Sequence, residues 1–355
     1  MYRTALVMIA RDEAHCIGRA LASLRDWVDD MWVLDTGSQD DTVAIAQAAG
    51  ARVGHFTWCN DFSAARNAAL ALAQADWHIV IDADEWLTAG GEALAALRRQ
   101  SPDFVGSIEV DSDCRVQQGG TPPSRTSDGT AQTGAPTWLP RILPGPVRYA
   151  GRIHEHPAHG LPVRRLPVRL GHDGYLPEAM QRKGDRNHVL LTQALREHPD
   201  DAYLLYQLGK DHEVHDRFEA ASHAYEQALP RVALSQAYRH DLVIRQMFAL
   251  QQCGQLAQAI HLAEAEMPHF GHSADFHFTL GDVLLSQATR HPEEAEQLLP
   301  MIESCWLRCL ELGDTLSLEG AVRGRGSFLA AHNLMVFHES LGHAAQAAHF
   351  RRLAK

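Results

Sequence analysis

The alternation of strand-like and helix-like stretches in the first 110 residues constrains the fold more than any other feature. Apolar, β-branched runs typical of strands lie within residues 5–10, 30–38, 52–58 and 77–87. Stretches with apolar residues three and four positions apart, typical of helices, lie between them at residues 13–27, 38–51 and 62–75. Right-handed strand–helix–strand units produce such an alternation. The sequence therefore predicts an α/β domain built on parallel strands.

The second predicted helix has recognisable ends. Ser38 is followed three residues later by Asp41, the pattern of a capping box, and Gly50 stands where a helix C-cap is expected. We therefore expect this helix to begin at Ser38 and to end at Gly50.

Polar side chains follow each predicted strand at the point where the strand ends: Arg11, Asp35, Asp61, and the pair Asp82 and Asp84. In open sheets with parallel strands, ligands bind beyond the carboxyl ends of the strands. The repeated placement of polar residues at these ends predicts a binding site along one edge of the sheet.

Asp82 and Asp84 come directly after the apolar run Ile79–Ile81. Acids at the end of a buried strand cost folding free energy unless something pairs with them. Two carboxylates separated by one residue can hold Mg²⁺ or Mn²⁺, which prefer oxygen ligands and share them with phosphates. The alternative interpretation is structural: Asp82 caps a following helix, and Asp84 and Glu85 lie in solvent.

Residues 117–137 are rich in Gly, Pro, Ser and Thr, which predicts a loop that is either a substrate lid or a tolerated insertion. Short strand-like segments follow. Residues 141–186 hold nine basic and four acidic side chains within an acidic chain. This local excess predicts an anion site, such as one for a phosphate, or a solvated basic face.

From about Gly184 the apolar period becomes helical and stays so. Gly209, Ala221 and Tyr225 have the offsets of a tetratricopeptide repeat, and the five-residue step from Gly254 to Ala259 recurs from Gly342 to Ala347. Plain helical hairpins are the alternative. We expect two domains, residues 1–185 and residues 186–355, and a homodimer formed through the helical domain is plausible.

Composition and net charge limit the classes of partner that the chain can be expected to bind. The net charge of −12 argues against nonspecific binding of nucleic acid. No apolar run approaches the roughly 20 residues that a transmembrane helix needs, and the first residues lack a secretory signal, so the expected location is cytoplasmic. The six cysteines include no CxxC pair and are interpreted as free thiols.

Four N-terminal motifs carry a family resemblance: "MIARDEAHCIGRALASL", "VLDTGSQDDTVAIA", "WCNDFSAARNAAL" and "IVIDADE". In order and spacing they resemble the family 2 glycosyltransferases with a GT-A fold. The resemblance is greatest to the branch with C-terminal tetratricopeptide-like helices, which includes peptide S-glycosyltransferases similar to SunS. It implies a GT-A mixed-sheet domain followed by an all-α domain.

The resemblance also implies residues that bind the nucleotide sugar. Asp35 matches an acid that contacts the base and ribose, and Ala10 and Arg11 match the strand end that lines the base pocket. Arg66 matches a basic residue near the base and diphosphate. Three further residues complete the predicted donor site: Asp61, Asp82 near the ribose, and Arg141 near the diphosphate. From the residues alone, Arg66 could instead form a surface ion pair with Asp61.

Metal ligands and a catalytic base follow from the same resemblance. Asp84 matches the direct ligand of Mg²⁺ or Mn²⁺, His172 resembles the late histidine that completes the coordination, and His154 is the second choice. In this family a carboxylate takes the acceptor's proton; Glu155 is the first candidate and Asp173 the second.

The predicted function is therefore an inverting, metal-dependent transfer of a sugar from a nucleotide-sugar donor, most often a UDP-sugar, to a peptide, protein or glycan acceptor. A nucleotidyltransferase is a weaker alternative, because "MIARDEAHC" lacks the glycines and lysine of a phosphate loop. The other alternative is a repeat-based scaffold protein with an inactive sugar-nucleotide domain.

Overall fold

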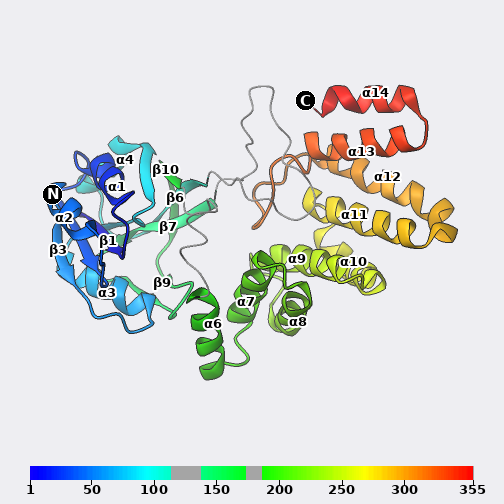
Figure 1. Cartoon of the computed structure of the whole chain (residues 1–355). Coiled ribbons are helices and arrows are strands. Elements are labelled where there is room, and N and C mark those ends of the chain that lie inside the picture. The colour runs from blue at the N-terminus through cyan, green and yellow to red at the C-terminus, as the bar shows by residue number, and fades with distance from the viewer. Residues whose placement is uncertain (113–136, 173–185, 355) are drawn as a thin grey trace. The chain divides into compact units, whose positions relative to one another are not determined.

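The computed structural model describes residues 1–112, 137–172 and 186–354. Within these residues the chain forms two compact units, which we call the N-terminal unit (to Leu190) and the C-terminal unit (from Leu191) (Figure 1). The predicted boundary between residues 185 and 186 stays a prediction, because residues 173–185 lie outside the described ranges. The 117–137 segment also lies outside them, except for Thr137, which begins a strand.

The first half of the N-terminal unit is the predicted strand–helix alternation. The parallel strands are β1 (Thr4–Ala10), β2 (Asp30–Asp35), β3 (Arg52–His55) and β4 (Trp77–Val80). The helices between them are α1 (Ile17–Leu24), α2 (Thr42–Ala48) and α3 (Phe62–Ala73). All of the strand stretches predicted in this half are present.

The second half adds strands of both directions to the same sheet. They are β5 (Glu85–Ala89), β6 (Val105–Ser112), β7 (Thr137–Pro144) and β10 (Val163–His172), and the sheet order is β3-β2-β1-β4-β7-β6-β10-β5. β7 is antiparallel to β4 and β6, β5 is antiparallel to β10, and β6 and β10 are parallel to each other. A short helix, α4 (Gly91–Ala96), runs into a 3₁₀ turn, Leu97–Arg99, and β8 (Arg148–Ala150) pairs with β9 (His156–Ala158). The eight-stranded mixed sheet confirms the predicted fold class.

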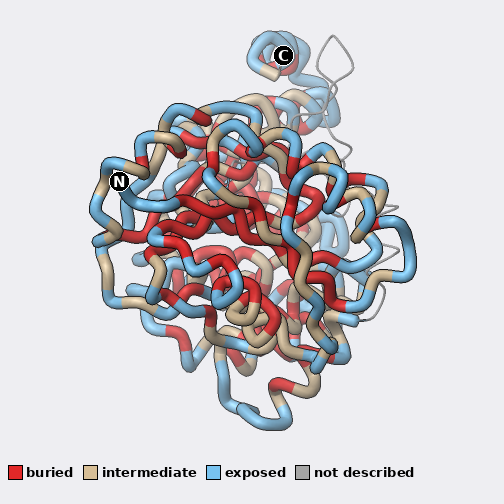
Figure 2. Tube along the Cα trace, turned by 90° about the vertical axis from the view of Figure 1, so that its left-hand side faces the viewer, coloured by how far each residue is buried: buried red, intermediate tan, exposed pale blue. Residues whose placement is uncertain are grey.

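The central strands are apolar on both faces, and this places the core. Leu6 and Met8 of β1 pack in one buried cluster, and Ala5 and Val7 pack in a second cluster. Because side chains alternate between the faces of a strand, the two clusters lie on opposite sides of the sheet. Figure 2 shows the buried residues along these strands. The sheet is therefore covered on both faces, and its strand ends remain available for a site.

The predicted capping box of the second helix is wrong. α2 begins at Thr42, and its N-cap residue, Asp41, makes no side-chain capping bond. Ser38 Oγ instead accepts a hydrogen bond from the Asp12 backbone N–H (3.0 Å), and Asp40 accepts one from the Thr42 N–H (3.0 Å). Ser38 thus connects two loops that are distant in sequence, which local spacing does not reveal.

The C-terminal unit consists of paired helices (Figure 1). They are α6 (Arg186–Glu197, which crosses the boundary), α7 (Ala202–Val214), α8 (Phe218–Ala228), α9 (Arg239–Gln252), α10 (Leu256–Phe270), α11 (Ala274–Arg290), α12 (Ala295–Leu312), α13 (Phe328–Ser340) and α14 (Ala344–Leu353). Cys305 and Cys309 of α12 are buried free thiols, as predicted. Within the described ranges, the helices are too short or too polar to cross a membrane.

Candidate functional site

The carboxyl ends of the parallel strands meet at one edge of the sheet, as predicted. Ala10 and Asp35 lie opposite each other at the ends of β1 and β2, and the Ala10 carbonyl accepts a hydrogen bond from the Thr36 N–H (2.9 Å). β4 runs parallel to β1, with Val80 opposite Val7. Residues that follow these strands, from Arg11 to the loop beyond Val80, therefore start from the same edge.

Asp35 is held in place by its own loop. The residue is 5% exposed. Its carboxylate accepts hydrogen bonds from the N–H groups of Gly37 (3.2 Å) and Ser38 (3.1 Å), and His55 Nδ1 lies 3.5 Å away. Burial raises the pKa of Asp35, but the hydrogen bonds from Ser38 and Gly37 favour the charged form more strongly, and the pKa is lowered. Asp35 is therefore an ionised acceptor at the strand end.

Arg66 is buried and joins two carboxylates. Its Nη2 donates to Asp82 Oδ1 (2.7 Å) and its Nε donates to Glu155 Oε1 (2.5 Å). Asp61 does not pair with Arg66; it caps α3 by accepting a hydrogen bond from the Ala64 N–H (2.9 Å). The alternative of a surface ion pair between Arg66 and Asp61 is therefore wrong.

Arg141 of β7 contacts the other oxygen of Asp82. Its Nη2 donates to Asp82 Oδ2 (2.8 Å) and to Glu85 Oε1 (2.6 Å), and Glu85 Oε2 accepts a hydrogen bond from the Asp82 N–H (2.9 Å). Although burial raises the pKa of Asp82, the charges of Arg141 and Arg66 hold it well below the usual range. The predominant effect at Glu85 is burial, which raises its pKa. Asp82 thus lies between two buried arginines.

The structural interpretation of the Asp82–Asp84 segment is also wrong. Asp84 is 9% exposed and Glu85 is 2% exposed, so neither is a solvated side chain. The segment leads into strand β5 and not into a helix. Asp84 and Glu85 are therefore both buried beyond the end of β4, and each has a specific partner.

Asp84 and His172, the two residues predicted as metal ligands, lie close together, and their role as ligands stays a prediction. His172 ends β10, and its Nε2 lies 3.5 Å from Asp84 Oδ2. Burial lowers the pKa of His172, but Asp84 raises it by more. Octahedral ligands about 2.1 Å from a cation lie roughly 3 Å apart, so a small movement would let both atoms bind one ion. The imidazole favours Mn²⁺ over Mg²⁺.

The remaining predicted residues lie around this edge or outside the described ranges. Arg11 is exposed, with its Nε 3.7 Å from an Asp12 oxygen. His154 lies between β8 and β9 with a φ of 51°. Among the described residues, no third His, Cys, Asp or Glu atom, that of His154 included, lies within 4.8 Å of both Asp84 and His172. The second candidate base, Asp173, lies outside the described ranges.

Two contributors were not predicted as site residues, Glu85 and Tyr149. Tyr149 Oη, Arg66 Nη1 and Arg141 Nε are buried and have no hydrogen-bond partner within the part of the chain that the structure describes. The Arg66 guanidinium lies 5.5 Å from the Tyr149 ring centre. Three buried donor groups beside Asp82 fit a ligand rich in oxygen. The only signal for Glu85 in the sequence was its place directly after Asp84, and there was no signal for Tyr149.

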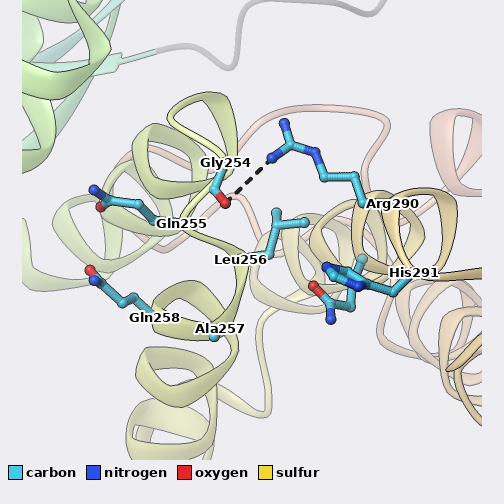
Figure 3. A pocket seen from close by; sticks show the side chains of 8 residues that line it. Gly254, Gln255, Leu256, Ala257, Gln258, Arg290 and His291 are labelled. Atoms are coloured by element: carbon cyan, nitrogen blue, oxygen red, sulfur yellow. Dashed lines mark hydrogen bonds between the residues drawn. The ribbon is translucent and has the colours of Figure 1, made fainter.

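The C-terminal unit has a pocket of its own. It measures about 280 Å³ and lies between the turn at Gly254–Gln258 and the end of α11, where Arg290 donates to the Gly254 carbonyl (3.4 Å) (Figure 3). Gln287 and His291 complete its lining. None of these residues belongs to the strand-end cluster, so this pocket is separate from the site described above.

A mixed sheet with ionised acids at its parallel strand ends, and an Asp-x-Asp segment behind a buried strand, defines the N-terminal unit as a GT-A domain of the nucleotide-sugar transferase type. Residues 5–128 match the model of glycosyl transferase family 2. The chain thus carries a family 2 glycosyltransferase domain followed by a helical C-terminal region, as the motifs predicted.

Two relatives span both parts. A TPR repeat-containing protein of Synechococcus elongatus is 35% identical over 283 residues, which are 75% of this chain and 66% of the relative. The prophage-derived glycosyltransferase SunS of Bacillus subtilis is 29% identical over 222 residues, which are 60% of this chain and 50% of the relative. The chain therefore spans between half and two thirds of the length of these relatives.

Two solved structures are similar over smaller parts. Glucosyl-3-phosphoglycerate synthase of Mycobacterium tuberculosis is 23% identical with a TM-score of 0.27, over 31% of this chain and 44% of that chain. MamA is 14% identical with a TM-score of 0.38, over 50% of this chain and 92% of that chain.

Proposed function

We propose that the chain is an inverting, metal-dependent glycosyltransferase that moves a sugar from a nucleotide-sugar donor, a UDP-sugar, to a peptide, protein or glycan acceptor. One observation carries the proposal. In a family 2 domain, Asp35, the arginine-bound Asp82 and the Asp84–His172 pair lie at the ends of strands of one sheet. That arrangement offers separate groups for the nucleoside, the diphosphate and a cation.

The donor site is assigned as follows. Ala10 and Asp35 contact the base and ribose, and the exposed Arg11 adds positive charge at the rim. The buried donors of Arg66, Arg141 and Tyr149 hydrogen-bond to diphosphate oxygens. Such donors stabilise the charge that develops on the departing diphosphate.

Asp82 has two roles in this site. Each of its oxygens accepts a hydrogen bond from one arginine. A carboxylate oxygen has a second lone pair, and the Asp82 side chain is 34% exposed. It can therefore orient both arginines and still accept a hydrogen bond from a ribose hydroxyl.

Asp84 and His172 are the residues that would hold the cation. A divalent cation bound there would neutralise charge on the leaving diphosphate. Two protein ligands are enough for Mg²⁺ or Mn²⁺, because these ions retain waters and share phosphate oxygens.

The base that takes the acceptor's proton is assigned to Glu155 first and Asp173 second. Arg66 Nε donates a hydrogen bond to Glu155 Oε1, which fixes the position of this carboxylate. Attack on the sugar from the face opposite the diphosphate inverts the anomeric configuration. The helical unit is assigned to acceptor binding, because stacked helix pairs form extended surfaces.

Calorimetric titration of the full chain with UDP tests the donor site. The wild type should bind UDP in the presence of Mn²⁺ and lose most of that affinity in EDTA. Asp84→Asn should remove the dependence on Mn²⁺, whereas Asp103→Asn, a change at a 60% exposed acid, should leave it intact. Absence of UDP binding by the folded wild type would contradict the proposal.

A donor-hydrolysis screen tests the choice of donor and the stereochemistry. UDP-, GDP- and dTDP-sugars are incubated with Mn²⁺, and proton NMR follows the first anomer released. We expect release from a UDP-sugar with inverted configuration. Preferential hydrolysis of GDP- or dTDP-sugars, or retention of configuration, would refute the corresponding part of the proposal.

A further inference from the structure

A second group of metal-binding side chains lies where the loop after β1 enters α1. Glu13, His15 and Cys16 each offer one ligand atom, and these atoms all lie within 4.8 Å of one another. Cys16 Sγ is 3.2 Å from Glu13 Oε2, and His15 Nε2 is 3.8 Å from the same oxygen. A thiol, an imidazole and a carboxylate thus converge on one point.

These separations are close to those of a tetrahedral zinc site. Zinc binds sulfur at about 2.3 Å, imidazole nitrogen at about 2.0–2.1 Å and carboxylate oxygen at about 2.0–2.2 Å. In a tetrahedron, ligands at those distances lie roughly 3.4–3.6 Å apart. The sulfur–oxygen and nitrogen–oxygen distances each differ from this range by less than half an ångström.

The loop is held in this shape by hydrogen bonds to the first residue of α2 and to the loop that precedes it. The Glu13 N–H donates to Thr42 Oγ1 (2.8 Å), and the Ala14 N–H donates to Asp40 Oδ2 (3.1 Å). The Glu13 carbonyl accepts from the Cys16 N–H (3.1 Å), which closes a turn around the three side chains. The ligand atoms are therefore positioned by the fold and need little ordering when an ion binds.

Burial and donor type both favour zinc. Cys16 is 4% exposed, whereas the His15 and Glu13 side chains are 43% and 27% exposed, so an ion can enter from the solvent side. A thiolate selects Zn²⁺ over Mg²⁺ and Mn²⁺. This donor set therefore differs from that of the Asp84–His172 pair, which contains no sulfur.

We propose that Glu13, His15 and Cys16 form a zinc site distinct from the cation site assigned to sugar transfer. The Cys16 thiol loses its proton to solvent when the ion binds, and a water molecule takes the fourth position. Zinc binding by this loop can be measured without any assay of sugar transfer.

Cobalt(II) titration of the full chain, stripped of metal with EDTA, tests the site. The wild type should show the near-ultraviolet absorption of a cobalt–thiolate bond, and Zn²⁺ should displace it. Cys16→Ser, which is nearly isosteric, should abolish this absorption, whereas Cys59→Ser, at an exposed cysteine, should retain it.

Two further variants make the result specific. His15→Ala, at a half-exposed position that should not disturb folding, should weaken zinc binding by more than the roughly 10–100-fold that loss of an outer partner costs. Asp84→Asn should leave the cobalt–thiolate absorption unchanged. A wild type without this absorption, or a Cys16→Ser protein that keeps it, would overturn the proposal, and neither result depends on whether UDP binds.

Discussion

Glu85 is almost completely buried, and both of its carboxylate oxygens are occupied. One accepts a hydrogen bond from Arg141, and the other accepts one from the Asp82 backbone N–H. Glu85 therefore fixes the position of Arg141 and the path of the chain at Asp82. Removal of the Glu85 carboxylate leaves the buried Arg141 guanidinium with one carboxylate partner fewer. Removing one partner of a buried ion pair is strongly destabilising, because the charge of the other partner stays buried.

We expect Glu85→Ala to lower the free energy of unfolding by about 3–5 kcal/mol. Glu85→Gln should cost less, because the amide retains an acceptor and most of the packing. Urea unfolding measures both, and Glu92→Ala, at an exposed glutamate of α4, is the control. A loss below about 1 kcal/mol for Glu85→Ala would show that Arg141 does not depend on this carboxylate.

The contacts around Asp82 show which parts of the site the sequence could predict and which it could not. The position of Asp82 and Asp84 after an apolar strand predicted a site at this strand end, and their roles in it stay a prediction. The contact between Asp82 and Arg141 spans 59 positions and depends on β7 pairing with β4. Local spacing gives no register for such a pair, so neither the arginine clamp nor the role of Glu85 was predicted.

Helix pairs α7–α8 and α11–α12 approach closely because a glycine faces an aromatic ring in each. A Cβ atom on Gly209 would lie 2.2 Å from the Tyr225 ring, and one on Gly281 would lie 2.6 Å from Trp306 Nε1. The repeat offsets of Gly209 and Tyr225 predicted a pair of helices here, but not the contact between these two residues.

Gly209→Ala should destabilise the C-terminal unit by about 1–3 kcal/mol, although alanine favours helix, because overpacking costs more than the propensity gains. Thermal unfolding followed by circular dichroism measures the change. Gly160→Ala, at a glycine with no atom within 4 Å of the added Cβ, is the control. Tyr225→Leu in the Gly209→Ala background should restore part of the stability, and failure to do so would contradict the proposed contact.

Helix α11 carries a buried acid, Asp282, that accepts a hydrogen bond from Asn333 Nδ2 of α13 (3.2 Å). Burial raises the pKa of Asp282 from 3.8 to about 7, against the opposing charge of Arg325. The folded protein therefore holds this proton more tightly than the unfolded chain does. The stability that results is complete below about pH 4 and is lost as the pH rises to about 7.

Asp282→Asn should therefore gain stability relative to the wild type as the pH rises from 4 to 8. The gain should be at most about 4 kcal/mol, because one pKa unit corresponds to about 1.4 kcal/mol. Urea unfolding at several pH values measures the difference, and Asp200→Asn, at an 80% exposed acid, is the control. An equal difference at pH 5 and pH 8 would show that Asp282 does not titrate in this range.

At the scale of the whole molecule, each unit has its own hydrophobic core. Buried clusters around Leu6 and Val7 belong to the N-terminal unit, and those around Val243 and Tyr225 belong to the C-terminal unit. The change of apolar period near Gly184 predicts a two-domain division, and the predicted boundary between residues 185 and 186 stays a prediction. Helix α6 crosses the limit of the N-terminal unit at Leu190. A period change cannot locate a boundary inside a helix. Association through the helical unit stays a prediction.

Because each unit has its own core, we expect the N-terminal unit to bind the donor without the C-terminal unit. A chain ending at residue 200 keeps α6 whole and stops before α7 begins at Ala202. Every described donor-site residue precedes that end. We expect this shortened chain to bind UDP with Mn²⁺ within about threefold of the full chain, a free-energy difference below about 1 kcal/mol.

Calorimetry on both chains measures the affinities, and circular dichroism establishes that the shortened chain is folded. If the helical unit binds the acceptor, the shortened chain should also retain donor hydrolysis while losing transfer to any acceptor that the full chain modifies. A folded shortened chain without UDP affinity would place part of the donor site in the helices. Unchanged transfer would remove the helical unit from acceptor binding, because the groups that bind the acceptor would then all lie before residue 200.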